Sequence, residues 1–150
     1  MIQVEIDSET GIPIATKLVE RAARATLDLS GVPDADLTIV LTGDERVRAL
    51  NRDFLHLDEP TDVLSFPADE PDPETGRRYL GDVVLSVPRA EAQAGAGGHP
   101  LEAEVQLLVV HGVLHLLGHD HAEAEEKDRM WAAQSEVLER LDIPPEILHE

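Results

Sequence analysis

Four of the seven histidines in this 150-residue chain lie in one short segment, HGVLHLLGHDH, at positions 111–121. His111 and His115 are four residues apart, so on a helix they share one face, with Cβ atoms about 6 Å apart. Gly118 lets the chain reverse after that helix, and His121 can then return to the same point. The spacing therefore predicts one metal ion held by His111, His115 and His121.

The ligand chemistry favours zinc in a catalytic site. The chain contains no cysteine, which leaves histidine and the carboxylates as the strong ligands. Zinc (Zn2+, one ion per chain) suits three imidazoles better than iron or copper, while nickel and cobalt stay open. Three protein ligands leave a fourth position for water, which is typical of a catalytic site. Zinc lowers the pKa of such a water to about 7, so the water or hydroxide can act near neutral pH.

Other interpretations of the histidines stay open. A single buried histidine is usually a hydrogen-bonded core residue, but burying two imidazoles unpartnered would cost about 1–3 kcal/mol each. His119 could replace His121 as third ligand, although it follows Gly118 directly and leaves less chain for the reversal. His119 as a fourth ligand would close the coordination sphere and make the site structural, without chemistry.

The spacing H-x-x-x-H-x-x-G-x-x-H is also that of the metzincin zinc peptidases. In those enzymes a glutamate follows the first histidine and acts as general base. Gly112 occupies that position here, so the metal scaffold fits and the peptidase chemistry does not. With Asp120 or His119 as an alternative base, a metal-dependent hydrolase of peptides or small molecules stays open as a second hypothesis.

Hydrophobic periodicity predicts the elements that must position the histidines. The segment 101–117 is apolar on nearly every side, which is typical of a buried helix, and Gly118 ends it. The order β-α-β-α-β-β-α-α-α predicts one α+β domain over residues 1–150, with helices packed on a mixed sheet. The predicted strands are 2–6, 37–41, 62–66 and 80–86. The predicted helices besides 101–117 are 14–29, about 42–54, a short one from 88, and about 122–141.

Two details concern the second predicted helix. Thr42 and Glu45 have the spacing of a capping box at its start. Val47, Leu50 and Phe54 recur at helical spacing and predict the stripe that the helix buries.

Three other segments have weaker signals. The segment 67–79 (PADEPDPETGRRY) is rich in proline and acid and predicts a long exposed loop between two antiparallel strands, with Ala68–Glu74 solvated. Asp62 and Asp82 fit equally well as turn or edge-strand carboxylates and as groove residues. The last residues, 142–150, are predicted to form a tail.

The charge balance argues against simple nucleic-acid binding. The chain has 12 basic and 31 acidic residues, a formal charge of −19, and such a surface repels RNA and DNA on average. The first residues, MIQVEIDSET, lack the features of a secretory signal. No apolar run approaches the roughly 20 residues that a membrane crossing needs. We therefore expect a cytoplasmic protein with no membrane partner.

Three motifs together resemble the YbeY family of bacterial metal-dependent endoribonucleases. The three motifs are the histidine segment, PTDVLSFP (Pro60–Pro67) and LGDVVLS (Leu80–Ser86). In addition, LNRDF (Leu50–Phe54) is similar to the family's upstream helix motif. The resemblance covers nearly the whole chain. It implies the same three zinc ligands, a mixed four-stranded sheet packed with about five helices, and a groove between the sheet edge and the central metal helix.

The resemblance also implies a function and partners. It implies cleavage of ribosomal RNA, at the 3′ end of the small-subunit RNA, and a role in ribosome quality control. The implied partners are RNA precursors or ribosomal particles, ribosomal proteins and a ribosome-associated GTPase, and no DNA. Because of the −19 charge, we expect a ribosome or protein partner to direct the chain to RNA. The third hypothesis is a non-catalytic zinc protein that binds the ribosome.

One position departs from the family pattern. Many members carry an arginine directly after the aromatic residue of the LNxxF-type motif, where this chain has Leu55. Arg52 or Arg48, on the same predicted helix, can take over that role, or activity depends less on an arginine. Arg52 joins the three histidines as a predicted catalytic residue, although most helix arginines are simply exposed.

Overall fold

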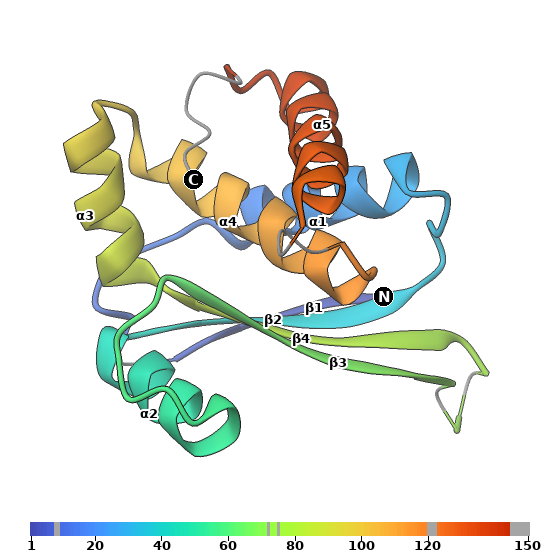
Figure 1. Ribbon diagram of the computed structural model, residues 1–150, viewed down its shortest axis with the longest axis horizontal. Helices are drawn as coiled ribbons and strands as arrows, with labels where there is room; N and C mark the ends of the chain where they lie inside the picture. The colour runs from blue at the N-terminus through green and yellow to red at the C-terminus, as the bar shows by residue number, and fades with distance from the viewer. Residues whose placement is uncertain (8–9, 72, 75, 120–122, 145–150) are drawn as a thin grey trace.

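The helices and strands follow one another in the order that the hydrophobic pattern predicts. The computed structural model describes residues 1–7, 10–71, 73–74, 76–119 and 123–144 (Figure 1). The elements in these ranges are β1 (Ile2–Ile6), α1 (Thr16–Leu29), β2 (Asp36–Thr42), α2 (Asp44–Leu55), β3 (Val63–Pro71), β4 (Arg78–Ser86), α3 (Val87–Gly97), α4 (Leu101–Leu116) and α5 (Ala124–Arg140).

The four strands form one mixed sheet in the order β1-β2-β4-β3. The pairs β1–β2 and β2–β4 are parallel, whereas β3 runs antiparallel to β4. The mixed four-stranded sheet and the antiparallel neighbours are therefore confirmed. In this order β3 pairs with β4 alone, so β3 is an edge strand.

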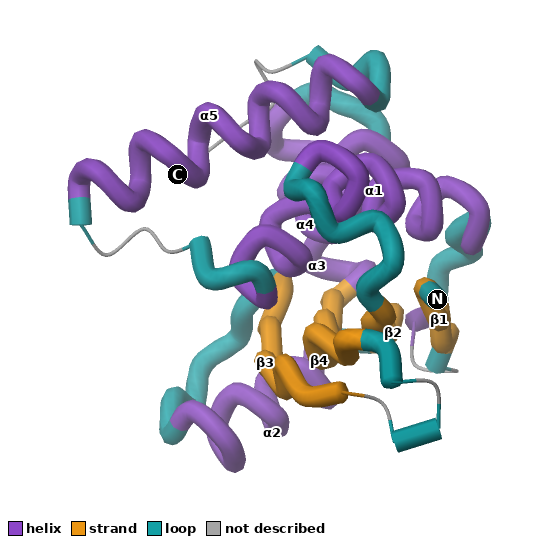
Figure 2. The backbone as a smooth tube through the Cα atoms, turned by 90° about the vertical axis from the view of Figure 1, so that its right-hand side faces the viewer, coloured by secondary structure: helices purple, strands orange, loops and turns teal. Residues whose placement is uncertain are grey.

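The sheet separates two unequal layers. α1, α4 and α5 lie on one face, and α2 lies on the other (Figures 1 and 2). The main core lies between the sheet and the larger helical layer, whereas α2 meets the sheet in a small second cluster around Val47, Leu64 and Val84. α4 contacts α1, α3, α5, β3 and β4, which confirms a central buried helix. Within the described ranges, none of the helices has the length and apolar character needed to cross a membrane.

The predicted long loop is mostly a β-hairpin. β3 continues to Pro71 and β4 begins at Arg78, with Glu70 opposite Tyr79 and a register shift after Pro67. Proline has no N–H to donate, but an edge strand tolerates it where the missing donor would face away from the neighbouring strand. Composition alone therefore underestimated the strands.

Two predictions about α2 were wrong. Thr42 belongs to β2 and donates its hydroxyl to Asp7 Oδ2 at 3.2 Å, while Gly43 occupies the N-cap of α2 without a side-chain cap. Phe54 is 65% exposed, although Val47 is fully buried. Phe54 contacts the edge of the sheet through the Phe66 ring, at 5.8 Å between centroids, and α2 lies alone on its face of the sheet, so most of the Phe54 side chain stays exposed.

The predictions for the C-terminal ends of α4 and α5 have different outcomes. Gly118 follows α4 with φ 98°, the left-handed conformation predicted for a helix end. The predicted tail is wrong at Ile143, which is 6% exposed and belongs to the main core. The residues after Pro144 lie outside the described part of the chain.

Candidate metal centre

The histidine pair on α4 has the geometry of two ligands of one metal ion. His111 Nε2 and His115 Nε2 lie 3.1 Å apart, and both side chains are half-buried. Two nitrogens bound to a tetrahedral zinc at 2.0–2.1 Å would be separated by about 3.3 Å. The pair therefore fits a zinc ion with little movement of either ring.

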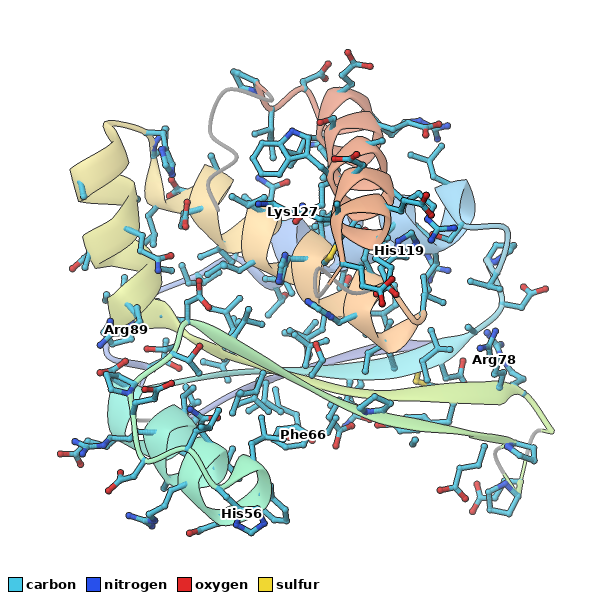
Figure 3. The ribbon with its side chains drawn as sticks, viewed as in Figure 1. His56, Phe66, Arg78, Arg89, His119 and Lys127 are labelled. Carbon is cyan, nitrogen blue, oxygen red and sulfur yellow. The ribbon has the colours of Figure 1, made fainter. Side chains whose placement is uncertain are left out.

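The predicted third ligand, His121, lies in the segment 120–122, outside the described residues. Among the residues that are described, no group of three or more histidine or carboxylate side chains could hold a metal ion. His119 lines a separate cavity of about 450 Å³ with Leu117, Gly118, Glu126 and Arg129. Figure 3 shows His119 close to the end of α4, beside the first turns of α5. This placement does not favour His119 as a third or fourth ligand.

The histidine pair opens on a cavity between α4 and the edge of the sheet. Its volume is about 330 Å³, and its lining residues are Thr61, Asp62, Val63, Leu64, Ser65, Pro67, His111 and His115. Most of the lining comes from the start of β3 and the residues before it. The cavity lies where the family resemblance implies a substrate groove.

The free edge of β3 brings backbone groups to this cavity. Ser86 N donates to Asp62 O at 2.9 Å, which makes Asp62 and Ser86 a hydrogen-bonded pair of the antiparallel ladder. Hydrogen-bonded and non-bonded pairs alternate in such a ladder. The N–H and C=O groups of Val63 and Ser65 therefore point away from β4, towards the free edge.

Gly112 allows α4 to lie directly against the sheet. A Cβ atom at this position would come within 2.6 Å of Val83 Cγ1 and 3.3 Å of Val63 Cγ2. The hydroxyl of Ser65 donates to the Gly112 carbonyl oxygen at 2.9 Å. A side chain at position 112 would point into β3 and β4, so the glutamate of the metzincin pattern has no room here.

Gln134 on α5 contacts the histidine pair, a role that sequence reasoning missed. Its Oε1 lies 2.9 Å from His111 Nδ1, and the residue is 6% exposed. The helical spacing of apolar residues predicts that Met130, Ala133, Val137 and Leu141 face inward, and Met130, Val137 and Leu141 are buried. A glutamine between two such residues is the signal that could have found this contact.

The two strand aspartates differ in their surroundings. Asp62 lines the cavity, and its Oδ2 accepts a hydrogen bond from Gln93 Nε2 at 3.3 Å. Asp82 accepts a hydrogen bond from the Tyr79 hydroxyl and is absent from the described cavity lining. Burial, and then the hydrogen bond to Asp82, raise the pKa of Tyr79. Of the two, Asp62 alone is placed to meet a ligand beside the histidines.

Arg52 lies on α2 and is not part of the described cavity lining. Its Nε donates to Asp53 Oδ1 at 3.0 Å, and this hydrogen bond raises the pKa of Arg52 further. Arg48 is similarly paired with Asp58, at 3.0 Å. Leu55 is the last residue of α2 and is 47% exposed. The structure thus brings together His111, His115 and Asp62, and leaves Arg52 outside this group.

Comparison with known proteins agrees with these motifs. Residues 3–142 match the family described as Endoribonuclease YbeY. Curated relatives named Endoribonuclease YbeY include one from Heliobacterium modesticaldum, 42% identical over 132 residues (81% of this chain, 80% of the relative). Another, from Persephonella marina, is 39% identical over 143 residues (94% of each chain). A third, from a Synechococcus strain, is 48% identical over 120 residues (76% of this chain, 74% of the relative).

A solved structure has the same fold. The solution structure of a protein from Thermotoga maritima aligns with a TM-score of 0.60 and 25% sequence identity, covering 95% of this chain and 92% of that one. The match of sequence motifs, family and fold extends over most of the chain. The chain therefore belongs to the YbeY endoribonuclease family.

Proposed function

We propose that the chain is a zinc-dependent endoribonuclease that cleaves ribosomal RNA precursors and contributes to ribosome quality control. Membership of the family indicates an endoribonuclease. The observation that carries the zinc-dependent part is the 3.1 Å separation of His111 Nε2 and His115 Nε2, beside a cavity at a sheet edge. His121 completes the ligand set in this proposal, because it follows the helix end at Gly118.

The residues around the cavity can bind and orient an RNA backbone. His111 and His115 hold the metal ion through Nε2, and the outward N–H groups of Val63 and Ser65 are donors for phosphate or ribose oxygens. A zinc ion held there supplies positive charge that stabilises the charge developing on a phosphoryl group during cleavage. The open edge of β3 suits single-stranded RNA, because a single RNA strand can run along this edge and across the cavity.

The second catalytic group is proposed to be Arg52. It lies on the opposite side of the sheet from α4, so RNA would reach it only by passing over the edge strand β3. Its hydrogen bond to Asp53 must then be exchanged for one to phosphate.

The net charge of −19 bears on how RNA is found. Affinity for free RNA comes mainly from neutralised phosphates, and the 12 basic residues of this chain are outnumbered by 31 acidic residues. We propose that ribosomal particles, ribosomal proteins or a ribosome-associated GTPase in the cytoplasm direct the protein to the 3′ region of the small-subunit RNA. Equal affinity for naked precursor RNA and for ribosomal particles would contradict this targeting.

The decisive experiment measures zinc and two activities on one preparation. Zinc per chain is determined together with cleavage of structured ribosomal RNA and of casein, for the wild type, His115→Ala and His119→Ala. We expect about one zinc ion per chain and RNA cleavage in the wild type, with both lost in His115→Ala. His119→Ala is the matched control, because its histidine lines a different cavity, and it should keep both.

The other outcomes separate the remaining hypotheses. Zinc-containing protein that cuts neither substrate would indicate a structural metal site in a ribosome-binding protein. Cleavage of casein would favour a hydrolase of the peptidase type. RNA cleavage that is unchanged in His115→Ala would point to a contaminating nuclease and would remove the proposed function.

A further inference from the structure

Gln134 brings a polar contact from α5 to the histidine pair on α4. It lies one turn after Met130 and one turn before Leu138, and all three residues are buried, at 6%, 2% and 0% exposure. This is the face of α5 that packs against the main core. A polar side chain on such a face lowers stability unless it is hydrogen-bonded. Its carbonyl Oε1 has a partner in His111 Nδ1, at 2.9 Å.

The direction of this hydrogen bond determines where the proton of His111 lies. An amide carbonyl oxygen can only accept, so His111 Nδ1 must be the donor and must carry the proton. A neutral imidazole with its proton on Nδ1 has its lone pair on Nε2. That Nε2 is the atom that lies 3.1 Å from His115 Nε2, and both rings line the cavity at the sheet edge.

We infer that Gln134 is a positioning residue for the metal centre. It holds the His111 ring in one orientation and in the tautomer whose Nε2 lone pair is available to a metal ion. The inference rests on the metal site of the proposed function, and it adds a residue from a second helix to that site. Contacts of this kind to the outer nitrogen of a ligand histidine commonly change metal affinity by about 10–100-fold.

Three variants separate this role from ordinary packing. Gln134→Leu removes the acceptor and keeps most of the volume, whereas Gln134→Glu keeps an acceptor oxygen at the same distance along the side chain. Gln106→Leu is the matched control. Gln106 is also 6% exposed and lies on α4, but its Nε2 donates to the Glu102 carbonyl oxygen at 3.1 Å.

The first measurement is zinc affinity, by competition with a chelating indicator at constant pH. We expect Gln134→Leu to bind zinc about 10–100-fold more weakly than the wild type, and Gln134→Glu and Gln106→Leu to bind it about as tightly as the wild type. Wild-type affinity in Gln134→Leu would overturn the inference. Equal losses in Gln134→Leu and Gln106→Leu would also overturn it, because they would reflect core packing in general.

The second measurement determines the tautomer of His111 in the protein with Gln134 unchanged. Metal-free protein labelled with ¹⁵N-histidine is examined by long-range ¹H–¹⁵N spectra, which distinguish the two imidazole tautomers, and His111 is assigned by its absence in His111→Ala. A proton on Nδ1 is expected, and a proton on Nε2 would overturn the inference. Wild-type protein that binds no zinc would instead overturn the metal site of the proposed function, while the tautomer would still test the contact with Gln134.

Discussion

The hydroxyl of Ser65 donates a hydrogen bond of 2.9 Å to the carbonyl oxygen of Gly112. This bond joins the edge strand β3 to α4 at the residue directly after His111. The missing side chain of Gly112 allows the approach, because a Cβ would come within 2.6 Å of Val83 Cγ1. The distance between α4 and β3, the two walls of the cavity, therefore depends on the Ser65 hydroxyl, on Gly112 and on Val83 beneath it.

Replacement of Gly112 should destabilise the protein, although alanine normally favours a helix. We expect Gly112→Ala to lower the free energy of unfolding by about 1–3 kcal/mol, the usual effect of overpacking a core. Urea denaturation followed by circular dichroism measures the change. Gly95→Ala is the control, because nothing lies within 4 Å of a Cβ there, and it should raise stability by about 0.5–1 kcal/mol.

A double-mutant cycle tests the cause of this effect. Val83→Ala removes the two methyl groups nearest to a Cβ at position 112, at 2.6 and 3.2 Å, so Gly112→Ala should cost less in the Val83→Ala background than alone. Strictly additive effects of the two substitutions would show that contact with Val83 is not the reason why Gly112→Ala lowers the free energy of unfolding.

Removal of zinc should lower thermal stability through the histidine pair. A ligand that binds only the folded state stabilises it, by about 4 kcal/mol when its free concentration is 1,000 times its Kd. We expect added zinc to raise the Tm of the wild type and a chelator to reverse the increase, as measured by differential scanning calorimetry. His115→Ala should lose this response and His119→Ala should keep it; a response that survives in His115→Ala would place the metal elsewhere.

An arginine at position 55 should increase RNA cleavage. Leu55 is 47% exposed at the end of α2, so a longer side chain can extend from it without displacing core residues. We expect Leu55→Arg to raise kcat/KM by about tenfold or more, because a guanidinium stabilises phosphoryl charge in the transition state. Leu55→Lys should gain less, since it lacks the planar paired donors of arginine.

The same cleavage assay tests Arg52. Arg52→Ala should reduce kcat/KM while leaving bound zinc unchanged, and Arg24→Ala on α1 is the control, because Arg24 is an exposed arginine outside α2. Equal rates for Arg52→Ala and the wild type would remove Arg52 from the catalytic residues. An unchanged rate in Leu55→Arg would show that cleavage is not limited by an arginine at this end of α2.

Acid should weaken the link between α2 and α3. Arg89 donates to both carboxylate oxygens of Asp44, at 3.0 and 3.1 Å, and this hydrogen bonding lowers the pKa of Asp44 below its ordinary value of 3.8. The folded protein therefore binds this proton less readily than the unfolded chain. The stabilisation is present above the unfolded pKa and is lost as the pH falls through the folded pKa.

Asp44→Asn should remove this part of the pH dependence. Both side chains are about one-third exposed, at 35% and 38%, so we expect a contribution of at most about 1 kcal/mol. Urea denaturation between about pH 5 and pH 3 should show a shallower loss of stability in Asp44→Asn than in the wild type. Arg89→Met should flatten the profile similarly, and a wild-type slope in both variants would contradict the assignment.

The element order and the histidine pair could be predicted because they depend on local periodicity. Apolar residues repeat at the spacing of a strand or a helix whatever lies opposite them, and His111 and His115 share a face once α4 is helical. Gly118 could be predicted as a helix end because the left-handed conformation is a property of one residue. Local patterns are therefore enough to predict the α+β layout and two residues of the candidate site.

The remaining features depend on which residues lie opposite one another. Phe54 has the spacing of a buried residue, but α2 lies alone on its face of the sheet and leaves it exposed. Gln134 and Gly112 acquire their roles only where α5 and β4 meet α4. These contacts join residues distant in the chain, and no local pattern encodes them. The support of the histidine pair therefore depends on how α4 packs against α5 and the sheet.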